Sequence, residues 1–478
     1  MIAEKILSNA QKHPDKNAVL SKGNLYTYKD IELKVNDSIS EIESVKLSNN
    51  EPFAIIMPNC IEFLALLFAA EKTGHCAVLL SEKFKSSEIN YHIECSEVKY
   101  IFTLNKDENE YKKYGFSIVK KSVDIIIWKK DKVVNQGAKY YPKDYICQIS
   151  SGTNGVSKGV IRTIASVRLE IEETIQCADI KQNDVFLTIP PIYHSYGLVA
   201  GALLPLFMGS FVILPETFIV ADIMKYISAY GVTILFAVPF MYQMMCESKA
   251  TVYEALSTLR KCFSAGAPMP EELFHRFYEV SNIYITQDYG STETGVMCIN
   301  NKPDLYAKSV GKPVGGRIFR VLNEEYEDVG LGQEGNLFTK SACNAGRYLY
   351  PEEFNSQFSD GWLKLDDYGY IDDNGYIYVI RRITNIINVA GMKVDPYEVE
   401  QIIMEIPGVK DAVVAAKHAK PYGTVVKAFV VAADNVGVRD IIEHCRNRIA
   451  DYKIPKAVEF LDQIPKSPVG KILRKYLV

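Results

Sequence analysis

A short stretch in the first third of the chain combines small hydroxyl side chains, glycines and one lysine. It runs from Ser150 to Val160, directly after the apolar run DYICQI, and reads SSGTNGVSKGV. Glycines let backbone N–H groups approach an anion and a lysine adds a positive charge, so the stretch could cradle phosphate groups. Because Gly, Asn and Ser also form surface turns with solvated lysines, an ordinary turn is the alternative.

The spacing of the glycines excludes one common phosphate loop. In the nucleoside-triphosphatase pattern G-x-x-x-x-G-K-[ST], the lysine directly follows the second glycine and precedes a hydroxyl that binds the metal. Here Gly152 and Gly155 are too close together, and Gly159 follows Lys158 where that hydroxyl would stand. If the stretch binds phosphate, it does so as a different kind of loop.

A second polar stretch, from Gln287 to Gly295, reads QDYGSTETG. It places an aromatic ring, several hydroxyls and two carboxylates on a glycine-flanked turn. An aromatic ring can stack on a base, and a carboxylate can bind a phosphate-bound Mg²⁺. Plain structural roles are also open here, since Tyr289 could fill the core and Glu293 could cap a helix.

Both stretches need elements that position them, and the apolar periodicity predicts these elements. Short strand-like runs alternate with segments in which apolar residues recur at helical intervals. Such alternation is typical of parallel α/β sheets. The predicted strands are residues 52–57, 75–80, 100–104, 184–189, 211–215 and 233–238, and the predicted helices are residues 60–74 and 166–180.

From about Asn323 the pattern changes to short, turn-rich strands such as QEGNLF and NGYIYVI, and the DDNG between strands predicts a hairpin turn. After Arg381–Asn385 the pattern predicts a helix, two strands, a second helix and a tail. This last stretch, of about a hundred residues, could fold as a small α+β unit.

Composition limits the class of protein. The chain has 478 residues, of which 48% are hydrophobic and 23% charged, so a globular protein of two or more domains is expected. A net charge of -4 argues against a protein that binds nucleic acid or anionic membrane, and favours small ligands. The ten cysteines stand singly, which predicts neither a zinc site nor disulfides. Without a basic leader or a run of membrane-spanning length, a soluble cytoplasmic protein is expected.

Five motifs, taken in chain order, resemble those of the adenylate-forming superfamily, which comprises acyl- and aryl-CoA synthetases, adenylation domains and luciferases. They are the loop at Ser150, SAGAP from Ser264 to Pro268, QDYGSTETG, the segment from Trp362 to Glu400, and the terminal IPKSPVGKILRKYL. The resemblance covers essentially the whole chain and is closest to acyl- and aryl-CoA ligases. It implies an acid–thiol ligase that uses ATP and Mg²⁺ to form acyl-AMP, releases pyrophosphate, and then transfers the acyl group to a thiol.

The resemblance also implies the domain organisation. A large N-terminal domain of α/β sheets with a β-rich subdomain, residues 1–382, would bind ATP and the acid. A small mobile α+β domain, residues 383–478, would carry the catalytic lysine. One site would then run two half-reactions in two domain orientations.

The positions that match the family's motifs imply where ATP binds. Adenine would lie between a strip of small residues and the Tyr289 ring, with Asp288 accepting a hydrogen bond from its amino group. The ribose hydroxyls would bind Asp367, assisted by Arg382. The other implied nucleotide contacts are Gly266, Ala267, Pro268 and Gly290 at the base, and Ser150, Ser151, Gly152, Thr153, Asn154, Gly155 and Lys158 at the β- and γ-phosphates.

The catalytic residues follow from the same resemblance. Thr292 would contact the α-phosphate, Glu293 would bind Mg²⁺, and Lys471 would lie between the carboxylate and the α-phosphate. His194, in PPIYHSYGL, resembles the aromatic-histidine pattern of acyl- and aryl-CoA ligases, although a lone histidine on an apolar segment is by itself more often a core residue. The implied pocket for the acid consists of His194, Ser195, Tyr196, Phe236, Val238, Pro239, Ala265, Gly266 and Gly290.

The identity of the acid and of the thiol stays open in the sequence. No aspartate stands near FAVP, Phe236 to Pro239, so an α-amino acid is disfavoured, and aryl and medium-chain acyl acids remain, with aryl slightly preferred. CoA is the expected acceptor, and phosphopantetheine on a separate acyl carrier protein is the alternative. A nucleotide-binding protein or phosphotransferase without adenylate chemistry is the alternative from a different class.

Several positions depart from the family's pattern. Asn154 replaces a hydroxyl residue of the loop and Ser157 its usual proline. Thr-Gly-Asp reads Leu365-Asp366-Asp367, so the ribose aspartate is Asp367 by register and Asp366 could be confused with it. The remaining departures lie at and beside the hinge and are Arg381 for glycine, Thr384 for an Asp or Lys, and Asn388 for lysine.

Overall fold

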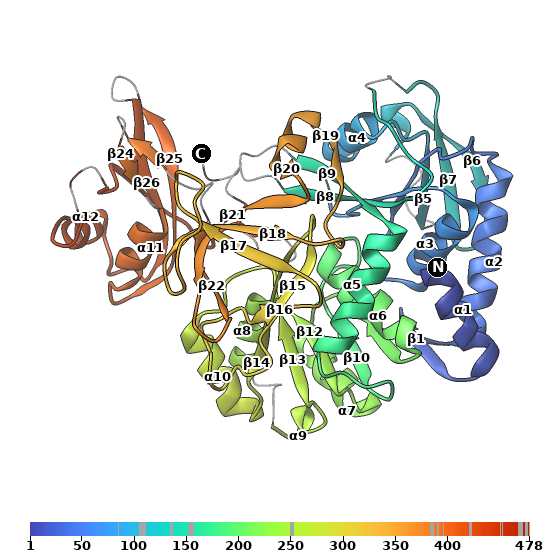
Figure 1. Cartoon of the computed structure of the whole chain (residues 1–478), viewed down its shortest axis with the longest axis horizontal. Coiled ribbons are helices and arrows are strands. Elements are labelled where there is room, and N and C mark those ends of the chain that lie inside the picture. Colours follow the sequence, from blue (N-terminus) through green and yellow to red (C-terminus); the bar gives the residue numbers. More distant parts are fainter. Residues whose placement is uncertain are drawn as a thin grey trace.

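The computed structural model describes residues 1–84, 86–104, 111–133, 137–151, 157–248, 253–382, 387–389, 392–394, 396–419, 423–449, 451, 453–466, 472–473 and 477. Figure 1 shows a large part that holds the N-terminus and most of the sheets, and a smaller part, drawn in red, that holds the last helices and strands. The predicted fold class, α/β with a β-rich region and a small α+β C-terminal unit, is confirmed.

The first large sheet has eight strands in the order β19-β9-β8-β4-β3-β5-β7-β6. Its centre, β8-β4-β3-β5, is parallel, and both sides are antiparallel. The strands are β3 (Phe53–Ile56), β4 (Ala77–Leu80), β5 (Tyr100–Leu104), β6 (Phe116–Lys121), β7 (Ile125–Lys130), β8 (Asp144–Ser151), β9 (Ser157–Thr163) and β19 (Arg347–Tyr350).

The second large sheet has nine strands in the order β16-β15-β14-β13-β12-β10-β11-β1-β2, and it is parallel from β14 to β1. The six strands predicted from apolar runs all occur, as β3, β4, β5, β10, β11 and β12. The strands of this sheet are β1 (Asn17–Ser21), β2 (Asn24–Thr27), β10 (Val185–Thr188), β11 (Phe211–Leu214), β12 (Ile234–Ala237), β13 (Lys261–Ser264), β14 (Ile285–Ser291), β15 (Gly295–Ile299) and β16 (Lys312–Pro313).

Helices pack between and around these sheets. Both predicted helices occur, as α3 and α5. Apolar residues from both sheets join α1, α2, α3 and α5 in one core cluster. The helices of the large part are α1 (Ile2–Lys12), α2 (Tyr28–Ser44), α3 (Ile61–Thr73), α4 (Ser86–Cys95), α5 (Ile164–Cys177), α6 (Leu204–Met208), α7 (Val220–Tyr230), α8 (Pro239–Glu247), α9 (Tyr253–Leu256) and α10 (Glu271–Ser281), with short 3₁₀ turns η1 (Lys112–Tyr114) and η3 (Glu352–Gln357) and a π-helix η2 (Tyr196–Leu203).

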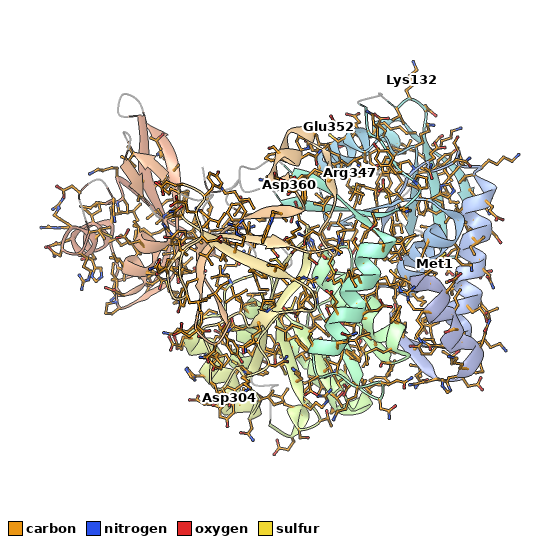
Figure 2. The ribbon with its side chains drawn as sticks, in the orientation of Figure 1. Met1, Lys132, Asp304, Arg347, Glu352 and Asp360 are labelled. Atoms are coloured by element: carbon orange, nitrogen blue, oxygen red, sulfur yellow. The ribbon has the colours of Figure 1, made fainter. Side chains whose placement is uncertain are left out.

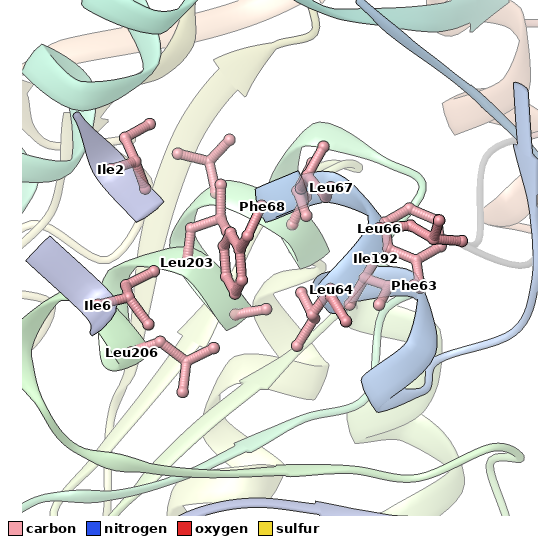
Figure 3. Packing of buried hydrophobic residues seen from close by; sticks show 14 of the residues in the cluster. Ile2, Ile6, Phe63, Leu64, Leu66, Leu67, Phe68, Ile192, Leu203 and Leu206 are labelled. Atoms are coloured by element: carbon pink, nitrogen blue, oxygen red, sulfur yellow. The ribbon is translucent and has the colours of Figure 1, made fainter. Parts of the chain in front are cut away.

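Helix α3 lies at the centre of this core. It is apolar on all sides, as expected of a helix surrounded by protein, and every residue from Ile61 to Glu71 is buried. Figure 3 shows its Phe68 and Leu64 packed among residues of α1, η2 and α6. The buried Glu71 carboxylate accepts hydrogen bonds from the N–H groups of Ile2 (2.7 Å) and Ala3 (2.8 Å), which stabilises the N-terminus of α1.

The β-rich region follows as predicted. Its five-stranded sheet has the order β17-β18-β21-β20, with β22 beside β21, and the DDNG sequence forms the turn between β21 and β22. In that turn the Asp372 carboxylate accepts from the N–H groups of Asn374 (2.9 Å) and Tyr376 (2.8 Å). The strands are β17 (Ile318–Leu322), β18 (Gly335–Lys340), β20 (Phe358–Ser359), β21 (Trp362–Ile371) and β22 (Ile377–Arg382).

The chain crosses from the eight-stranded sheet to this five-stranded sheet through η3. Figure 2 labels Arg347, Glu352 and Asp360 along the crossing. Tyr348 and Gln357, at its two ends, are joined by a hydrogen bond of 2.9 Å from the Tyr348 hydroxyl. This crossing therefore brings residues near 350 beside the strands that flank the Ser150 loop.

The C-terminal part has a core of its own, in which α11 and α12 pack on β25 and β26. Strands β25 and β26 are antiparallel, and β27 is parallel to β26. None of the described helices of the chain is both long and apolar enough to cross a membrane. The elements are β23 (Ile387–Val389), β24 (Met392–Val394), α11 (Pro396–Met404), β25 (Val409–Ala419), β26 (Gly423–Ala432), α12 (Val438–Arg446) and β27 (Ala457–Phe460).

Candidate active site

The stretch SSGTNGVSKGV joins two antiparallel strands. Ser150 lies opposite Lys158, and Ser151 opposite Ser157, at the ends of β8 and β9. The predicted phosphate contacts Gly152, Thr153, Asn154 and Gly155 lie outside the described residues, and Ser151 is described only by its backbone pairing.

The turn of the second motif meets this hairpin. Turn residues Thr292 and Glu293 are half-buried between β14 and β15, and Thr294 fixes the turn by accepting a 3.0 Å hydrogen bond from the Ser291 N–H at its hydroxyl. The Glu293 Oε1 atom accepts hydrogen bonds from the Ser150 hydroxyl (3.1 Å) and the Tyr348 hydroxyl (3.2 Å). Segments from three parts of the chain thus converge on one carboxylate.

Lys158 points into the protein. It is 5% exposed, so the interpretation as a solvated turn lysine does not apply to it. Its ammonium lies 4.0 Å from the ring centre of Phe354 and 4.8 Å from that of Tyr348, and donates a 3.3 Å hydrogen bond to Gln357. Burial lowers the pKa of Lys158, while the Glu293 carboxylate acts in the opposite direction. The Lys158 ammonium is therefore held by two aromatic rings, near the Glu293 carboxylate that would bind the predicted Mg²⁺.

A second polar group lies on β14, β21 and β22. The Tyr289 hydroxyl donates a 2.5 Å hydrogen bond to Asp367, and the Arg382 Nε atom lies 3.6 Å from the other oxygen of this carboxylate. Asp367 and Arg382 are opposite each other in the β21–β22 register. Burial raises the pKa of Asp366, the neighbouring carboxyl, and the Arg382 charge opposes that shift. The three residues predicted to hold the nucleoside, Tyr289, Asp367 and Arg382, therefore lie together.

The strip SAGAP follows β13 at the same edge of the sheet. Gly266 has φ +85°, a conformation that side chains disfavour, and it is exposed together with Pro268, while Ala267 is half-buried. Gly290 must be glycine for another reason, because a Cβ atom there would lie 2.3 Å from the Gly295 carbonyl oxygen. Small residues at both positions leave room beside the Tyr289 strand.

The segment with His194 lies between the two large sheets. Asn59 accepts a 2.8 Å hydrogen bond from the Ile192 N–H, and Gln148 donates a 3.2 Å hydrogen bond to the Tyr193 carbonyl. His194 is half-buried, with its ring 4.5 Å from the Tyr193 ring. Because Gln148 stands two residues before Ser150 on β8, the same strand supports the predicted acid pocket and the predicted phosphate loop.

The π-helix η2 begins directly after Ser195. Its Tyr196 ring meets the Phe236 ring edge-on at 5.6 Å, and Phe236 stacks on Phe263 at 4.9 Å. Ala265, Ser195, Val238 and Pro239, also predicted for the acid pocket, are buried. Helices of the π type are rare and occur often at functional sites, and the sequence pattern did not predict this one.

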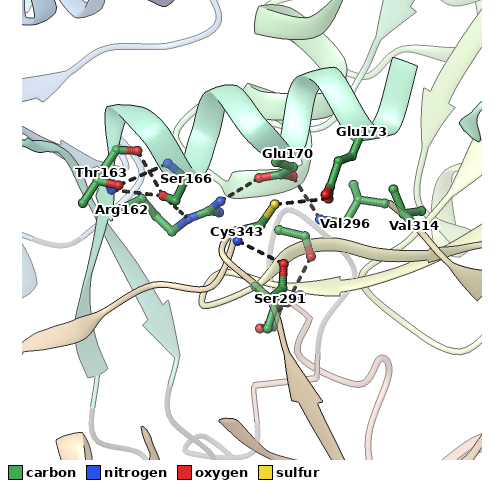
Figure 4. A network of polar contacts seen from close by, with 12 residues as sticks. Arg162, Thr163, Ser166, Glu170, Glu173, Ser291, Val296, Val314 and Cys343 are labelled. Atoms are coloured by element: carbon green, nitrogen blue, oxygen red, sulfur yellow. Dashed lines mark hydrogen bonds and ion pairs between the residues drawn. The ribbon is translucent and has the colours of Figure 1, made fainter. Parts of the chain in front are cut away.

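A buried polar network links α5 to the turn of Glu293, as Figure 4 shows. Glu170 accepts hydrogen bonds from Arg162 on β9 (2.9 Å) and from the Val296 N–H on β15 (2.9 Å). One helical turn on, Glu173 accepts a hydrogen bond of 2.6 Å from Arg317. Sequence reasoning missed these carboxylates, although two acids three residues apart on the apolar side of a predicted helix were an available signal.

The predictions for the hinge and for the C-terminal lysine cannot be placed. Lys471 and the hinge residue Thr384 lie outside the described residues, and the same holds for the side chain of Asn388. The proposed boundary after Arg382 falls at the edge of residues 383–386, which are also outside them.

The donors suit the implied ligands. In the described part of the chain no three His, Cys, Asp or Glu residues gather as a metal site, so Mg²⁺ would be held by Glu293 together with oxygens of the substrate, as this ion often is. Several buried polar atoms have no hydrogen-bond partner among the described residues, and those on the predicted nucleotide-binding residues and strip include Ser264 Oγ, Asp288 Oδ1 and Arg382 Nε. These atoms fit a polar ligand such as a nucleotide and its acid.

The two sheets, the β-rich region and the converging loop, turn and nucleoside residues define an adenylate-forming enzyme. The chain belongs to the AMP-binding enzyme family, which matches residues 7–349, and the family's C-terminal domain matches residues 398–471. The resemblance in the motifs and the predicted enzyme class, an AMP-forming acid–thiol ligase, are thereby confirmed.

Named relatives extend over nearly the whole chain. The 2-succinylbenzoate–CoA ligase of Bacillus licheniformis is 27% identical over 98% of this chain and 98% of its own. The long-chain-fatty-acid–CoA ligase of Yersinia pestis is 25% identical, covering 98% and 92%. The fatty acid–[acyl-carrier-protein] ligase of Streptomyces coeruleorubidus is 27% identical, covering 98% and 94%.

Solved structures show the same fold. The o-succinylbenzoate CoA synthetase of Bacillus subtilis with its acyl-adenylate superposes with a TM-score of 0.83 at 24% identity, over 99% of this chain and 97% of that one. An anthranilate CoA ligase in complex with anthranoyl-AMP gives 0.82 at 21% identity, over 100% and 96%.

Proposed function

We propose that this protein, in the cytoplasm, uses ATP to activate a carboxylic acid and then transfers the acyl group to a thiol, with CoA as the proposed acceptor. In the first step a carboxylate oxygen attacks the α-phosphorus, the bond to the β-phosphate oxygen breaks, and pyrophosphate leaves. In the second step the thiol sulfur attacks the acyl carbon and AMP leaves. One observation carries the proposal, which is that Glu293 accepts hydrogen bonds from Ser150 and Tyr348 at the meeting point of the loop strands, the turn and the crossing segment.

The first step brings two anions together, so the site has to neutralise charge. Lys158 supplies a buried cation near Glu293 and would face the leaving phosphates. Thr292, half-buried in the same turn, would donate to the α-phosphate. Bound Mg²⁺ would supply further positive charge to the phosphates, and Glu293 would be its protein ligand.

The nucleoside would be held by the second polar group. Asp367 would accept from the ribose hydroxyls while Tyr289 and Arg382 hold its carboxylate in place. The ring of Tyr289 and the strip Gly266, Ala267 and Pro268 would then bound the adenine. The Nε atom of Arg382, although within ion-pair distance of Asp367, makes no hydrogen bond among the described residues, and it suits an acceptor on the ligand.

We further propose that residues 383–478 act as a separate domain and that Lys471 serves the first step. A cation between carboxylate and α-phosphate lowers the barrier for joining two anions, whereas thiol attack on the finished anhydride has no such need. The independent core of the C-terminal part supports the division.

For the acid we propose an aryl or medium-chain acyl acid and not an α-amino acid. The aromatic wall formed by Tyr196 and Phe236 supports a flat or short acyl group. CoA is the proposed thiol because most of the named relatives are CoA ligases, and the relative that acts on an acyl carrier protein keeps a separate carrier as the second candidate.

The test is a panel of carboxylic acids assayed for pyrophosphate release with ATP and Mg²⁺, each with CoA, with a phosphopantetheine-loaded carrier protein, and with neither. Acid-dependent pyrophosphate release with thioester product supports the proposal, and the acceptor that yields thioester identifies the thiol. Formation of ADP and a phosphorylated product, with no pyrophosphate, would instead identify a phosphotransferase. ATP binding with no turnover for any acid would identify a nucleotide-binding protein.

A further inference from the structure

Lys158 is held by three side chains that come from β19 and from η3, the 3₁₀ turn that follows it. Its ammonium lies 4.0 Å from the ring centre of Phe354 and 4.8 Å from that of Tyr348. The two ring centres are 6.1 Å apart, and the ring planes are inclined at 68°. Because of these three distances, the rings approach the ammonium from directions roughly at right angles to each other. We call Tyr348, Phe354 and Gln357 the lysine cage.

The third member of the lysine cage is an acceptor without charge. Gln357 Oε1 accepts a 3.3 Å hydrogen bond from the Lys158 ammonium and a 2.9 Å hydrogen bond from the Tyr348 hydroxyl. An ammonium can only donate, so the amide must present its oxygen to Lys158. The lysine is thus oriented by a hydrogen bond that does not neutralise its positive charge.

The charged groups around the lysine cage show where the ammonium can act. Burial lowers the pKa of Lys158, and the carboxylates of Glu293 and Asp366 act against this shift. The Arg382 charge acts in the same direction as burial. Gln357 is the one hydrogen-bond partner of the ammonium in the described part of the chain, and an ammonium has three donors. Donors therefore remain for phosphate oxygens beside the proposed metal and nucleoside residues.

The composition of the lysine cage suits a cation that is kept for an anionic ligand. A lysine side chain is flexible, and ordering it only when the ligand arrives would weaken binding. An aromatic face attracts the ammonium without carrying a negative charge that would pair with it. A carboxylate at position 357 would also hold the lysine, but it would compete with phosphate groups for the positive charge.

Building on the proposed ligase activity, we infer that Phe354 and Gln357 are positioning residues for ATP, which hold the Lys158 ammonium where the β- and γ-phosphates bind and act only through this lysine. AMP and the acyl-adenylate lack these two phosphates. The lysine cage therefore serves the binding of ATP and not that of the nucleoside. Phe354 and Gln357 lie outside the five motifs that carry the family resemblance.

The expected effect follows from the strength of the ring contact. Loss of a desolvated contact between an ammonium and an aromatic ring changes an equilibrium constant by a factor of about 5 to 30. We therefore expect Phe354→Leu, which stays apolar but has no ring, to weaken ATP binding about 5- to 30-fold. Phe354→Tyr keeps a ring and should bind ATP nearly as the wild type does. Gln357→Glu keeps an acceptor for Lys158 but adds a negative charge near the phosphates, so it should weaken ATP binding about tenfold without lowering the Tm.

The experiment measures the dissociation constants of ATP with Mg²⁺ and of AMP by titration calorimetry on the full-length protein, in the absence of any acid. The variants are Phe354→Leu, Phe354→Tyr, Gln357→Glu, Lys158→Ala and the double variant that combines Lys158→Ala with Phe354→Leu. The control Phe358→Leu removes another partly buried ring of the same apolar cluster. The Phe358 ring packs on Tyr348 at 5.4 Å and makes no contact with the Lys158 ammonium among the described residues. The Tm and acid-dependent pyrophosphate release are measured for every protein.

We expect Phe354→Leu and Gln357→Glu to weaken the binding of ATP with little change for AMP, and Phe358→Leu to leave both affinities nearly unchanged. In the Lys158→Ala background, Phe354→Leu should have no further effect on ATP binding. A residue that acts only through the lysine has nothing to act on once the ammonium is gone, and the double variant measures this dependence directly.

Unchanged or tighter ATP binding by Phe354→Leu would overturn the inference, and so would a loss that adds to that of Lys158→Ala. Equal losses for ATP and AMP with a lower Tm would show a structural role instead. If Lys158→Ala bound ATP as tightly as the wild type, Lys158 would not contact the phosphates, and the inference would be wrong together with that assignment. A lack of pyrophosphate release with every acid would count against the ligase proposal, whereas the affinities for ATP and AMP would still decide the role of the lysine cage.

Discussion

Replacing Glu170 with alanine would leave the guanidinium of Arg162 buried without its countercharge. Arg162 is 0% exposed, and its Nη1 atom already has no hydrogen-bond partner in the described part of the chain. Removing one partner of a buried ion pair costs about 3–5 kcal/mol, because the remaining charge is uncompensated. The Val296 N–H would lose its acceptor as well. We therefore expect Glu170→Ala to lower the free energy of unfolding by about 3–5 kcal/mol.

The matched control lies on the same helix. Glu172 pairs with Arg168 at 2.9 Å, and both side chains are partly exposed, at 38% and 47%. Exposed pairs of this spacing contribute about 0.3–0.5 kcal/mol, so Glu172→Ala should have a small effect. A third variant, Arg162→Met with Glu170→Leu, removes both buried charges and should recover a large part of the loss.

Urea unfolding followed by tryptophan fluorescence measures these differences, since Trp128 is buried in the eight-stranded sheet. A second readout is pyrophosphate release, because Glu170 holds β15 directly behind the Glu293 turn. If Glu170→Ala lowered the free energy of unfolding no more than Glu172→Ala, the buried Arg162–Glu170 pair would not contribute the expected stability. If the double variant were as unstable as Glu170→Ala, the loss would come from packing and not from the unpaired charge.

Three further variants test the proposed site. Lys158→Ala should lower kcat/KM for ATP by about 10²-fold while binding of a supplied acyl-adenylate changes little, and a large loss of acyl-adenylate affinity would contradict a role at the leaving phosphates. Tyr289→Phe removes the 2.5 Å hydrogen bond to Asp367 and should raise the KM for ATP about tenfold with kcat nearly unchanged, whereas an unchanged KM would separate Asp367 from ribose binding. Lys471→Ala should nearly abolish adenylate formation yet still convert supplied acyl-adenylate and CoA to thioester, and equal losses in both half-reactions would rule out a role limited to the first.

Much of the fold follows from local patterns. The six apolar runs predicted as strands all form strands, as is typical of short apolar runs between turn residues that are buried on both faces of a sheet. Helix α3 and the DDNG turn were predicted for equally local reasons, namely the length of an apolar helix and the φ preference of Gly375.

The motifs alone identified the family, and they predicted a residue for each part of the reaction. Order along the chain does not reveal which side chains meet, however. Three contacts join segments far apart in sequence: Tyr348 with Glu293, Gln357 with Lys158, and Arg317 with Glu173 on α5. No periodicity or motif encodes contacts of this kind.

The sequence by itself determined the family and the alternation of strands and helices, and it predicted the residues of the proposed site, because these depend on spacing over a few residues. Only the tertiary structure decided that Lys158 is held by aromatic rings and that Tyr289 on β14 meets Asp367 on β21. The physical reason is that burial and facing depend on the strands packed alongside, and the order of strands in a sheet is set by contacts among the whole set of elements and not by any one segment.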